Sequence, residues 1–424
     1  MKHMTFRERR YRRAHLDCVR HITLDPKGPG VVRIHMIPPK DDTPSAPFLL
    51  LLNGAQLVPL NLSWAIMLAN LMDQLQAHEG QELEEGRWEA LLSAAVEETH
   101  RTYPHTKRQT LAADLHLMLT SLIAIARGRE PEAEVALLSL GEYAVEMTAP
   151  HRMDLMVSAM EQDGAWHCNQ KCLHCYAAGQ PMGQTEELST EQWKTILQTL
   201  RSSNIPQVTF TGGEPTLRDD LVELVRAAEW FVTRLNTNGR RLTPELCAGL
   251  YAASLDSVQV TLYSAEGNIH NQLVGVNGFN DTVQGIRSAV EAGLIPSGGA
   301  DTQESRATAL SPEELTDILR QAADTAEELG MELDFTSPGW LPEETLRALG
   351  LHLIPSCGAC LSNMAVTPDG KVVPCQSWLS GEPLGDLLTD RWADIWNSRH
   401  CAAIRAKSAK MEHICQLKGK EAGE

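Results

Sequence analysis

The segment from residue 166 to 176 carries the residues whose spacing most clearly implies chemistry. It places Cys168, Cys172 and Cys175 at C-x3-C-x2-C within one short loop. Three thiolates this close together can share one face of a metal or cluster, and iron–sulfur clusters are usually held by four cysteines. The loop offers no fourth protein ligand, so one iron stays open to bind another group. Because an open position separates catalytic from structural zinc, we apply the same logic by analogy and expect a reactive cluster.

Two other interpretations of this loop stay open at the level of the sequence. His167 or His174 could complete a structural zinc site, since zinc accepts imidazole and thiolate ligands alike. A disulfide is disfavoured, because two cysteines only three residues apart rarely meet the required geometry.

A second motif follows about forty residues later. The β-prone run at 208–211 ends in Gly-Gly-Glu-Pro at 212–215. In this order and at this distance, the two motifs resemble the radical S-adenosylmethionine (SAM) superfamily. The resemblance implies a SAM-binding [4Fe–4S] cluster on the three loop cysteines, with the methionine end of SAM at the open iron. One electron passed into the sulfonium would then release a 5′-deoxyadenosyl radical.

The resemblance also implies contacts to SAM itself. Gly212, Gly213 and Glu214 would meet its amino group, because backbone groups and a carboxylate suit an ammonium and glycine lets the chain approach closely. The remaining implied contacts are His174 beside the adenine, Thr237 and Asn238 at the ribose or carboxylate, and Ser264 at the carboxylate.

A further group of cysteines lies between residues 357 and 415. The spacing Cys360-x9-Gly370-x4-Cys375 resembles the opening of the SPASM/twitch domain, which holds auxiliary iron–sulfur clusters. The full seven-cysteine pattern is absent, so the resemblance implies one auxiliary [4Fe–4S] cluster. The expected ligands are Cys357, Cys360, Cys375 and Cys415. Cys401 is the alternative fourth ligand, and a zinc site of the same spacing is the alternative for the whole group.

Composition narrows the class of protein. The net charge of −18 over 424 residues argues against nucleic acid or an anionic membrane as partner. The ten cysteines are clustered like metal ligands rather than spread like a disulfide framework, and reduced thiolates on a cluster imply a cytoplasmic location. No apolar run follows the basic start, so no secretory signal is expected. The most apolar stretch, 48–72, is too interrupted to span a membrane.

The chain divides into three expected domains, and the fold class is α/β. Residues 1–150 form an α-rich accessory domain, with strands at 32–36 and 48–52 and helices near 64–75, 87–99 and 108–127. Ser63 is the expected cap of the first of these helices. This domain weakly resembles a peptide-binding winged helix, and a domain that only packs on its neighbour is the alternative. Residues 339–424 form the small cluster domain.

Between residues 151 and 338 strands alternate with helices, which calls for parallel βαβ units. The pattern resembles the partial (βα)6-type barrel of the family, whose sites form at the carboxyl ends of strands. Residues 294–310 are too few for the strand–helix pair expected there. The barrel is therefore predicted one βα unit short, with Met331–Thr336 as its following strand.

The resemblance predicts a radical SAM oxidoreductase that modifies a peptide or protein by crosslinking, oxidation or epimerisation, as in the maturation of ribosomal peptides. A flavodoxin- or ferredoxin-type protein would supply electrons. The alternatives are a sulfatase-maturating or cofactor-biosynthesis enzyme. An alternative of another class is a catalytically impaired iron–sulfur redox or binding scaffold. It is motivated by the short barrel and by His270–Gly275, which lacks the arginine that the family often places before this glycine.

Overall fold

The computed structural model describes residues 4–24, 32–40, 46–54, 56–77, 85–138, 140–144, 147–298, 311–329, 333, 335, 341–351, 357–410 and 415–417. The chain forms two compact units. The first comprises residues 1–148 with 200–207 and 230–232, and the second comprises residues 149–199, 208–229 and 233–424. Each unit is described by itself below.

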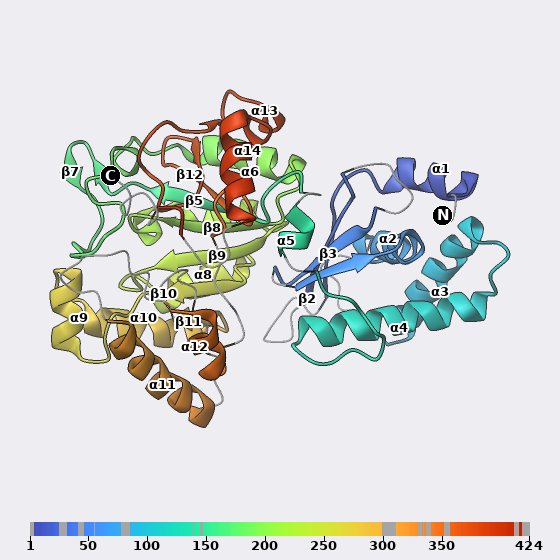
Figure 1. The fold of residues 1–424 in the computed structure, drawn as a ribbon, viewed down its shortest axis with the longest axis horizontal. Coiled ribbons are helices and arrows are strands. Elements are labelled where there is room, and N and C mark those ends of the chain that lie inside the picture. The colour runs from blue at the N-terminus through green and yellow to red at the C-terminus, as the bar shows by residue number, and fades with distance from the viewer. Residues whose placement is uncertain are drawn as a thin grey trace. The chain divides into compact units, whose positions relative to one another are not determined.

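The first unit is built on a four-stranded antiparallel sheet in the order β1-β2-β3-β4 (Figure 1). Its strands are β1 (Arg20–Leu24), β2 (Val32–Ile37), β3 (Phe48–Leu52) and β4 (Gln56–Leu60). The sequence predicts β2 and β3 but misses both edge strands. Strand β4 was not predicted because it contains Pro59, and proline is tolerated in a sheet only at an edge or a bulge.

Four helices complete the first unit, together with the short α5 (Leu140–Tyr143). They are α1 (Phe6–His15), α2 (Leu62–Gln76), α3 (Glu85–Thr102) and α4 (Arg108–Ala126). The expected cap of α2 is wrong: the Asn61 side chain accepts the hydrogen bond from Trp64 N, and Ser63 donates to Asn61. Asparagine suits this position because its side-chain oxygen reaches the free N–H groups of the first turn.

Helix α4 is long and apolar enough to cross a membrane by length and composition alone. In the structure its apolar side chains Leu111, Leu115, Met118 and Leu122 lie in the core that α2 and the sheet also build. This placement is that of a core helix in a folded unit.

The second unit contains an eight-stranded sheet in the order β11-β10-β9-β8-β5-β12-β13-β14. Strands β9, β10 and β11 pair in parallel, as do β5 and β12. In chain order, the first five strands of this sheet are β5 (Arg152–Ser158), β8 (Gln207–Gly212), β9 (Val232–Thr237), β10 (Ser257–Val260) and β11 (Ile295–Gly298). The intervening helices are α6 (Thr190–Ser202), α7 (Leu221–Ala227), α8 (Pro244–Ala252), α9 (Gly267–Val274), α10 (Phe279–Glu291) and α11 (Pro312–Leu329). This is the α/β arrangement with a parallel sheet that the strand–helix alternation predicts.

Strand β11 corrects one expectation. Residues 294–310 were expected to be too few for a strand–helix pair, yet the strand β11 lies within them and pairs in parallel with β10. Four residues suffice for this strand, and the capped helix α11 that begins at Pro312 supplies its helix. The barrel therefore does not lack a strand at this point. The predicted strand Met331–Thr336 lies almost wholly outside the described residues.

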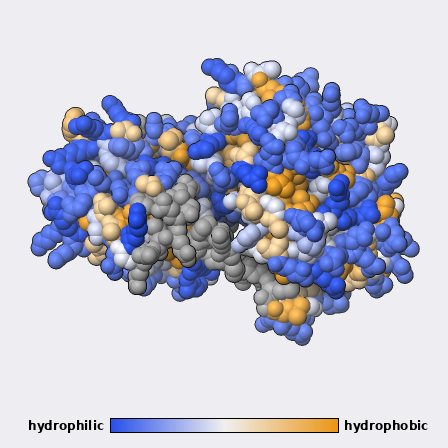
Figure 2. Space-filling model, turned by 180° about the vertical axis from the view of Figure 1, so that it is seen from behind, coloured by the Kyte–Doolittle hydropathy of each residue, from blue (hydrophilic) through white to orange (hydrophobic). Residues whose placement is uncertain are grey.

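The C-terminal region continues the same sheet. It contains an antiparallel hairpin of β12 (Asn363–Val366) and β13 (Lys371–Val373), followed by β14 (Gly385–Asp386). Helix α12 (Glu343–Ala348) precedes the hairpin, and α13 (Trp392–Trp396) and α14 (Arg399–Ser408) follow it. Because β12 pairs along β5, it covers a sheet edge that would otherwise be open. Figure 2 shows hydrophilic residues over most of one face of the molecule, in line with its net charge.

Candidate functional site

The Gly-Gly-Glu turn lies where β8 ends against the end of β5. Gly212 has φ of +123°, a backbone conformation that favours glycine. A Cβ on Gly212 would lie 2.1 Å from the carbonyl oxygen of Ser158, and one on Gly213 would lie 2.5 Å from that of Ala159. The turn therefore needs glycine at both positions because the neighbouring backbone is in contact with it.

The carboxylate of Glu214 joins the ends of β8 and β9. Its Oε1 accepts hydrogen bonds from Thr216 N at 3.0 Å, Thr216 Oγ1 at 2.5 Å and Thr237 Oγ1 at 2.6 Å. Its Oε2 accepts one from Asn238 N at 2.8 Å. At 1% exposure, the carboxylate needs such donors to offset its burial. Glu214, expected only as a contact to SAM, thus also positions two further expected contacts, Thr237 and Asn238.

The cysteine loop is fastened to the end of helix α9. Lys171 N donates to Val274 O and Leu173 N donates to Leu273 O, each at 2.9 Å. Gly275 ends the helix with φ of +69°, and a Cβ there would lie 2.6 Å from Lys171 O. This glycine, noted in the sequence for its missing arginine neighbour, is required for the close approach of the loop.

Residues after β9 hold the same loop from Asn169. The Asn238 side chain donates to Asn169 Oδ1, and Arg240 Nη1 donates to Asn169 O, each at 2.6 Å. Arg240 also pairs with Asp281 at 3.2 Å. Sequence reasoning missed Arg240 and Asn169. The available signal was the position of Arg240 directly after the Thr-Asn-Gly turn at a strand end.

The loop thiols are protonated in the metal-free chain. Burial, with smaller effects from Glu214 and neighbouring thiols, raises the pKa of Cys168 and of Cys172 to about 12. Burial also raises the pKa of Cys175. The Cys168 thiol donates to Gly213 O at 3.3 Å, so the loop contacts the Gly-Gly-Glu turn directly. Metal binding must displace these protons.

The donor set fits an iron–sulfur cluster better than a single zinc ion. Thiolates on one tetrahedral zinc lie about 3.8 Å apart, given a Zn–S distance of about 2.3 Å. Among the residues that the structure describes, no three His, Cys, Asp or Glu side chains are grouped closely enough to hold one ion. Of the two histidines that could complete a zinc site, His167 lies 3.6 Å from Glu187 and His174 packs against Tyr263.

His174 and Ser264 lie in one region of the site. The His174 ring packs edge-on against Tyr263, with ring centres 4.3 Å apart, and Ser264 follows Tyr263 in the chain. Burial lowers the pKa of His174, and its Nε2 is buried without a hydrogen-bond partner among the described residues. The Ser264 hydroxyl accepts a hydrogen bond from Glu266 N at 3.0 Å. Sequence reasoning missed Tyr263, whose position three residues after β10 was the available signal.

The C-terminal cysteines gather around the β12–β13 hairpin. Cys360 N donates to Pro374 O at 3.1 Å, which places Cys360 beside Cys375. Burial, with smaller effects from the nearby thiols of Cys357 and Cys415, raises the pKa of Cys375 to about 12. All four expected ligands of the auxiliary cluster therefore lie in one region of the chain.

Helix α14 provides further contacts to this group. The Cys357 thiol lies 3.8 Å from both Ser408 Oγ and Gln416 Nε2, and Gln416 directly follows Cys415. Cys401, the alternative fourth ligand, is fully buried, and its Sγ accepts a hydrogen bond from Arg405 Nη1 at 3.5 Å. A surplus of buried thiols around one hairpin suits an auxiliary cluster.

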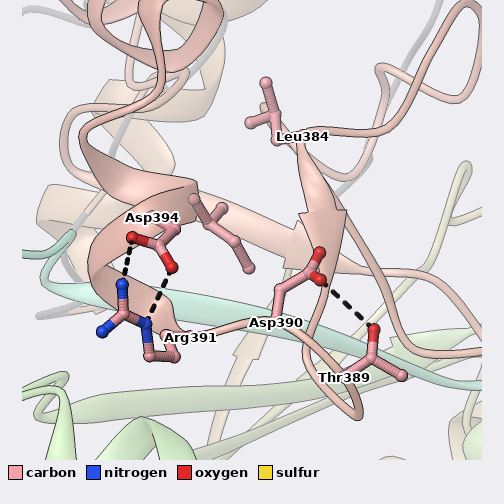
Figure 3. A pocket seen from close by; sticks show the side chains of 6 residues that line it. Leu384, Thr389, Asp390, Arg391 and Asp394 are labelled. Carbon is pink, nitrogen blue, oxygen red and sulfur yellow. Dashed lines mark hydrogen bonds and ion pairs between the residues drawn. The ribbon is translucent and has the colours of Figure 1, made fainter.

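A surface hollow of about 370 Å³ lies in the same C-terminal region (Figure 3). Its charged groups are paired within the chain: Arg391 binds both oxygens of Asp394, and Asp390 accepts from Asp386 N at 2.8 Å. We assign no ligand to this hollow because its polar groups already have partners.

Curated relatives match the chain over a limited length. A probable GTP 3′,8-cyclase of Thermococcus kodakarensis is 36% identical over 126 residues, which cover 29% of this chain and 41% of that protein. A probable GTP 3′,8-cyclase of Saccharolobus islandicus is 36% identical over 132 residues, 30% of this chain and 42% of that protein. The chain thus spans about two-fifths of the length of the curated relatives it matches.

Among solved structures, Streptococcus suis SuiB bound to S-adenosylmethionine has a similar fold. It aligns with a TM-score of 0.51 and 16% identity over 85% of this chain and 87% of SuiB. At this identity the likeness concerns the fold alone.

Two family models match separate parts of the chain. Residues 167–302 match the radical SAM superfamily, and residues 357–417 match the SPASM iron–sulfur cluster-binding domain. The first match includes the cysteine loop, the Gly-Gly-Glu turn and the ends of β9 and β10, and the second includes the C-terminal cysteines. Residues 167–302 therefore form a radical SAM domain, with a SAM-binding [4Fe–4S] cluster, and residues 357–417 form a SPASM domain with an auxiliary iron–sulfur cluster.

Proposed function

We propose that this radical SAM enzyme modifies a peptide or protein substrate by crosslinking, oxidation or epimerisation. The observation that carries the proposal is the presence of radical SAM and SPASM matches in one chain. The net charge of −18 supports it, because such a chain repels anionic substrates and favours neutral or basic ones.

In the proposed site, Cys168, Cys172 and Cys175 hold the SAM-binding cluster, and bound SAM supplies a 5′-deoxyadenosyl radical for hydrogen abstraction. The residues of the chain bind and orient SAM and shield the reacting atoms. The backbone at Gly212 and Gly213 approaches the methionine ammonium, while the carboxylate of Glu214 adds its charge.

The remaining proposed contacts differ in what they offer SAM. His174 would present to the adenine an imidazole whose Nε2 has no hydrogen-bond partner among the described residues. Thr237, Asn238 and Ser264 supply hydroxyl and amide groups for the ribose and carboxylate. Cys168 is buried and Cys172 and Cys175 are half-buried, which limits the access of water to the reacting atoms.

A second candidate function is nucleotide cyclisation, because the curated relatives are named probable GTP 3′,8-cyclases. The acidic character of the chain disfavours a triphosphate substrate, and the match covers less than half of those proteins. We therefore keep it as the alternative that the experiment must separate.

The test incubates the anaerobically reconstituted enzyme with SAM and a reductant. One arm contains synthetic peptides from short cysteine-containing reading frames beside the gene, and the other contains GTP. The proposal expects 5′-deoxyadenosine together with a peptide that has lost two hydrogens or changed the configuration of a residue. Turnover of GTP with no change in any peptide would overturn it in favour of the cyclase. Absence of 5′-deoxyadenosine in both arms would support the scaffold alternative.

The proposal extends to partners and location. A flavodoxin- or ferredoxin-type protein would donate the electron, and the enzyme would work in the cytoplasm, where its thiolates stay reduced. Residues 1–150 would bind the peptide, with 151–338 as the radical SAM domain and 339–424 as the cluster domain. Removal of the first domain should then raise the KM for peptide while SAM cleavage without peptide persists.

A further inference from the structure

We propose that one face of strands β9 and β10 is a binding site for a peptide segment that carries a carboxylate. Its residues are Arg234, Asn236, Ser257 and Gln259, and together they are called the polar face below. Arg234 takes the carboxylate, and the other three side chains bind the neighbouring peptide groups. The inference rests on the proposed function, because it names the kind of peptide that the enzyme accepts.

The register of the two strands places the four side chains side by side. Strands β9 and β10 pair in parallel, with Arg234 beside Ser257 and Asn236 beside Gln259. Because side chains two residues apart in a strand point to the same face of a sheet, all four lie on one face. All four are half-buried. They form a compact group of two neighbouring pairs that solvent or a ligand can reach.

The opposite face of these strands packs against helix α10. The residues that alternate with the polar face are Leu235, Val258 and Val260, and each is at most 1% exposed. A Cβ on Gly239 would lie 2.7 Å from Val260 Cγ1 and 3.5 Å from the carbonyl oxygen of Thr282 in α10. The apolar side chains therefore point to the helix, and the polar face points away from it.

The side chains of the polar face have no hydrogen bond or ion pair with the residues that the structure describes. Half-buried polar groups need such partners from water or from a ligand. The carboxamides of Asn236 and Gln259 each offer both donors and an acceptor, and the hydroxyl of Ser257 offers one of each kind. These groups match the C=O and N–H groups of a peptide backbone.

The charge of Arg234 is what selects a carboxylate. Its neighbour Arg152 pairs with Asp154 at 2.9 Å, and the Asp256 carboxylate accepts hydrogen bonds from Thr233 N and Oγ1 at 2.8 and 3.1 Å. Burial and, after it, the charge of Arg152 lower the pKa of Arg234, against the effect of the two carboxylates. A bound anion would therefore stabilise this guanidinium.

One unpaired guanidinium matches one carboxylate, which it can bind through two parallel hydrogen bonds. A triphosphate carries several negative charges, and a single cation within an acidic chain would leave most of them uncompensated. A peptide of low net charge with one carboxylate suits both the acidic chain and this cation. The charges thus favour a peptide over a nucleotide.

The polar face adjoins the expected contacts to SAM. Asn236 directly precedes Thr237, the last residue of β9. Arg234 lies three residues before Thr237, which is about 10 Å along a strand. A peptide anchored at Arg234 can therefore extend over Asn236 to the strand end, where the radical would form.

The experiment measures binding without turnover, in the reconstituted enzyme with SAM and no reductant, by anaerobic titration calorimetry. The probes are acetyl-Gly-Glu-Gly-amide, acetyl-Gly-Gln-Gly-amide, acetyl-Gly-Gln-Gly with a free terminal carboxylate, and inorganic triphosphate. At least one carboxylate peptide should bind about tenfold more tightly than the neutral amide, as a charged hydrogen-bonded pair implies. The comparison of the two carboxylate peptides shows whether a side chain or a chain end is bound.

Three variants separate the roles within the polar face. Arg234→Gln should lose the preference for a carboxylate and bind the neutral amide as the native enzyme does. Arg234→Lys keeps the charge but not the paired donors, so it should retain part of the preference. Asn236→Ala should weaken all three peptides alike and keep the preference. Arg241→Gln, at an exposed arginine of the same unit, is the matched control and should leave every affinity unchanged.

Four results would overturn the proposal: no binding of any peptide to the native enzyme, no preference for a carboxylate, the native preference in Arg234→Gln, or an equal loss in Arg241→Gln. Triphosphate that binds more tightly than every peptide, and does so through Arg234, would make this a phosphate site instead. If Arg234→Gln does not fold, an undiminished preference in Arg234→Lys overturns the role of Arg234. A carboxylate preference without modification of any peptide would support the site and contradict the proposed function.

Discussion

The two units of the molecule bury different kinds of side chain at their strands. In the first unit all five residues of β3, Phe48 to Leu52, are buried and apolar. In the second unit, strands β8 and β9 end in buried polar groups, among them Thr211, Glu214, Thr237 and Asn238. The first sheet is continuous with an apolar core. The second ends in a hydrogen-bonded network around one carboxylate.

This difference separates stability from function. Burial of an apolar side chain contributes about 1.5–3 kcal/mol wherever it packs, so the apolar core of the first unit acts mainly on stability. A buried carboxylate is tolerated only with donors in the right places, so the network of the second unit is specific to what it positions. Changes to the first unit should alter stability, and changes to the second should alter cofactor binding.

The largest expected effect is that of Cys172→Ala in the second unit. Removal of one of three loop thiols should abolish SAM cleavage and leave the auxiliary iron in place, because the C-terminal cysteines are a separate group. The measurements are 5′-deoxyadenosine by chromatography and iron per chain. Cys18→Ala, at an exposed cysteine of the first unit, is the control that should cleave SAM normally. Cleavage by Cys172→Ala would show the site assignment to be wrong.

Next in size is Leu50→Ala in the first unit. Leu50 is 0% exposed in β3, and such a truncation should lower the free energy of unfolding of this unit by about 2–5 kcal/mol. Hydrogen exchange of the β2 and β3 amides measures this loss. Leu137→Ala, at a leucine 56% exposed in the same unit, should change it by no more than about 0.5 kcal/mol. A large loss of bound iron in Leu50→Ala would contradict the separation of the two units.

A smaller effect is expected for Thr237→Val, which preserves the shape of the side chain but removes the hydrogen bond to Glu214 Oε1. A hydrogen bond to a charged group contributes about 1.5–3 kcal/mol, so SAM should bind about tenfold or more weakly. Anaerobic equilibrium dialysis measures the affinity. Thr195→Val, at an exposed threonine of α6, should bind SAM as the native chain does. Unchanged affinity in Thr237→Val would mean that the network does not position the SAM site.

The smallest expected effect is the acid sensitivity of the first unit. Burial lowers the pKa of His35 from 6.5 to about 3, so the unfolded chain takes up this proton before the folded chain does. The stability that the neutral His35 contributes is fully present above pH 6.5 and is lost as the pH falls toward 3. Between pH 7 and pH 5.5 this one residue should lower the free energy of unfolding of the first unit by about 1 kcal/mol.

Hydrogen exchange of the β2 amides, corrected for intrinsic rates, measures this loss of stability as the pH falls. His35→Gln keeps a donor for Trp230 O, the partner of His35 Nε2, and should make the profile flatter over this range. His105→Gln, at an exposed histidine, should leave the profile unchanged. If stability falls with pH equally steeply in His35→Gln and in the native chain, His35 is not the cause of the acid sensitivity.

Strand β11, which the sequence analysis did not predict, shows where local sequence patterns fail. Residues 294–310 are rich in Gly, Ser and Thr, and the strand within them, β11, has four residues. Its backbone is fixed by pairing along β10, and such pairing leaves no periodic signal in so short a run. The edge strand β4 was missed for a related reason, since Pro59 reads as a breaker when the neighbouring strand is unknown.

The sequence by itself determined the chemistry. The spacing of Cys168, Cys172 and Cys175 and the Gly-Gly-Glu turn indicate the cluster and its cofactor. Ligands within one short loop lie close together whatever the rest of the fold is. Only the tertiary structure decided how they are held. Glu214 and Thr237 lie 23 positions apart, and Asn169 and Arg240 lie 71 apart. Such contacts depend on which strand ends are neighbours and on where each helix stops, and both are settled by packing of the whole sheet.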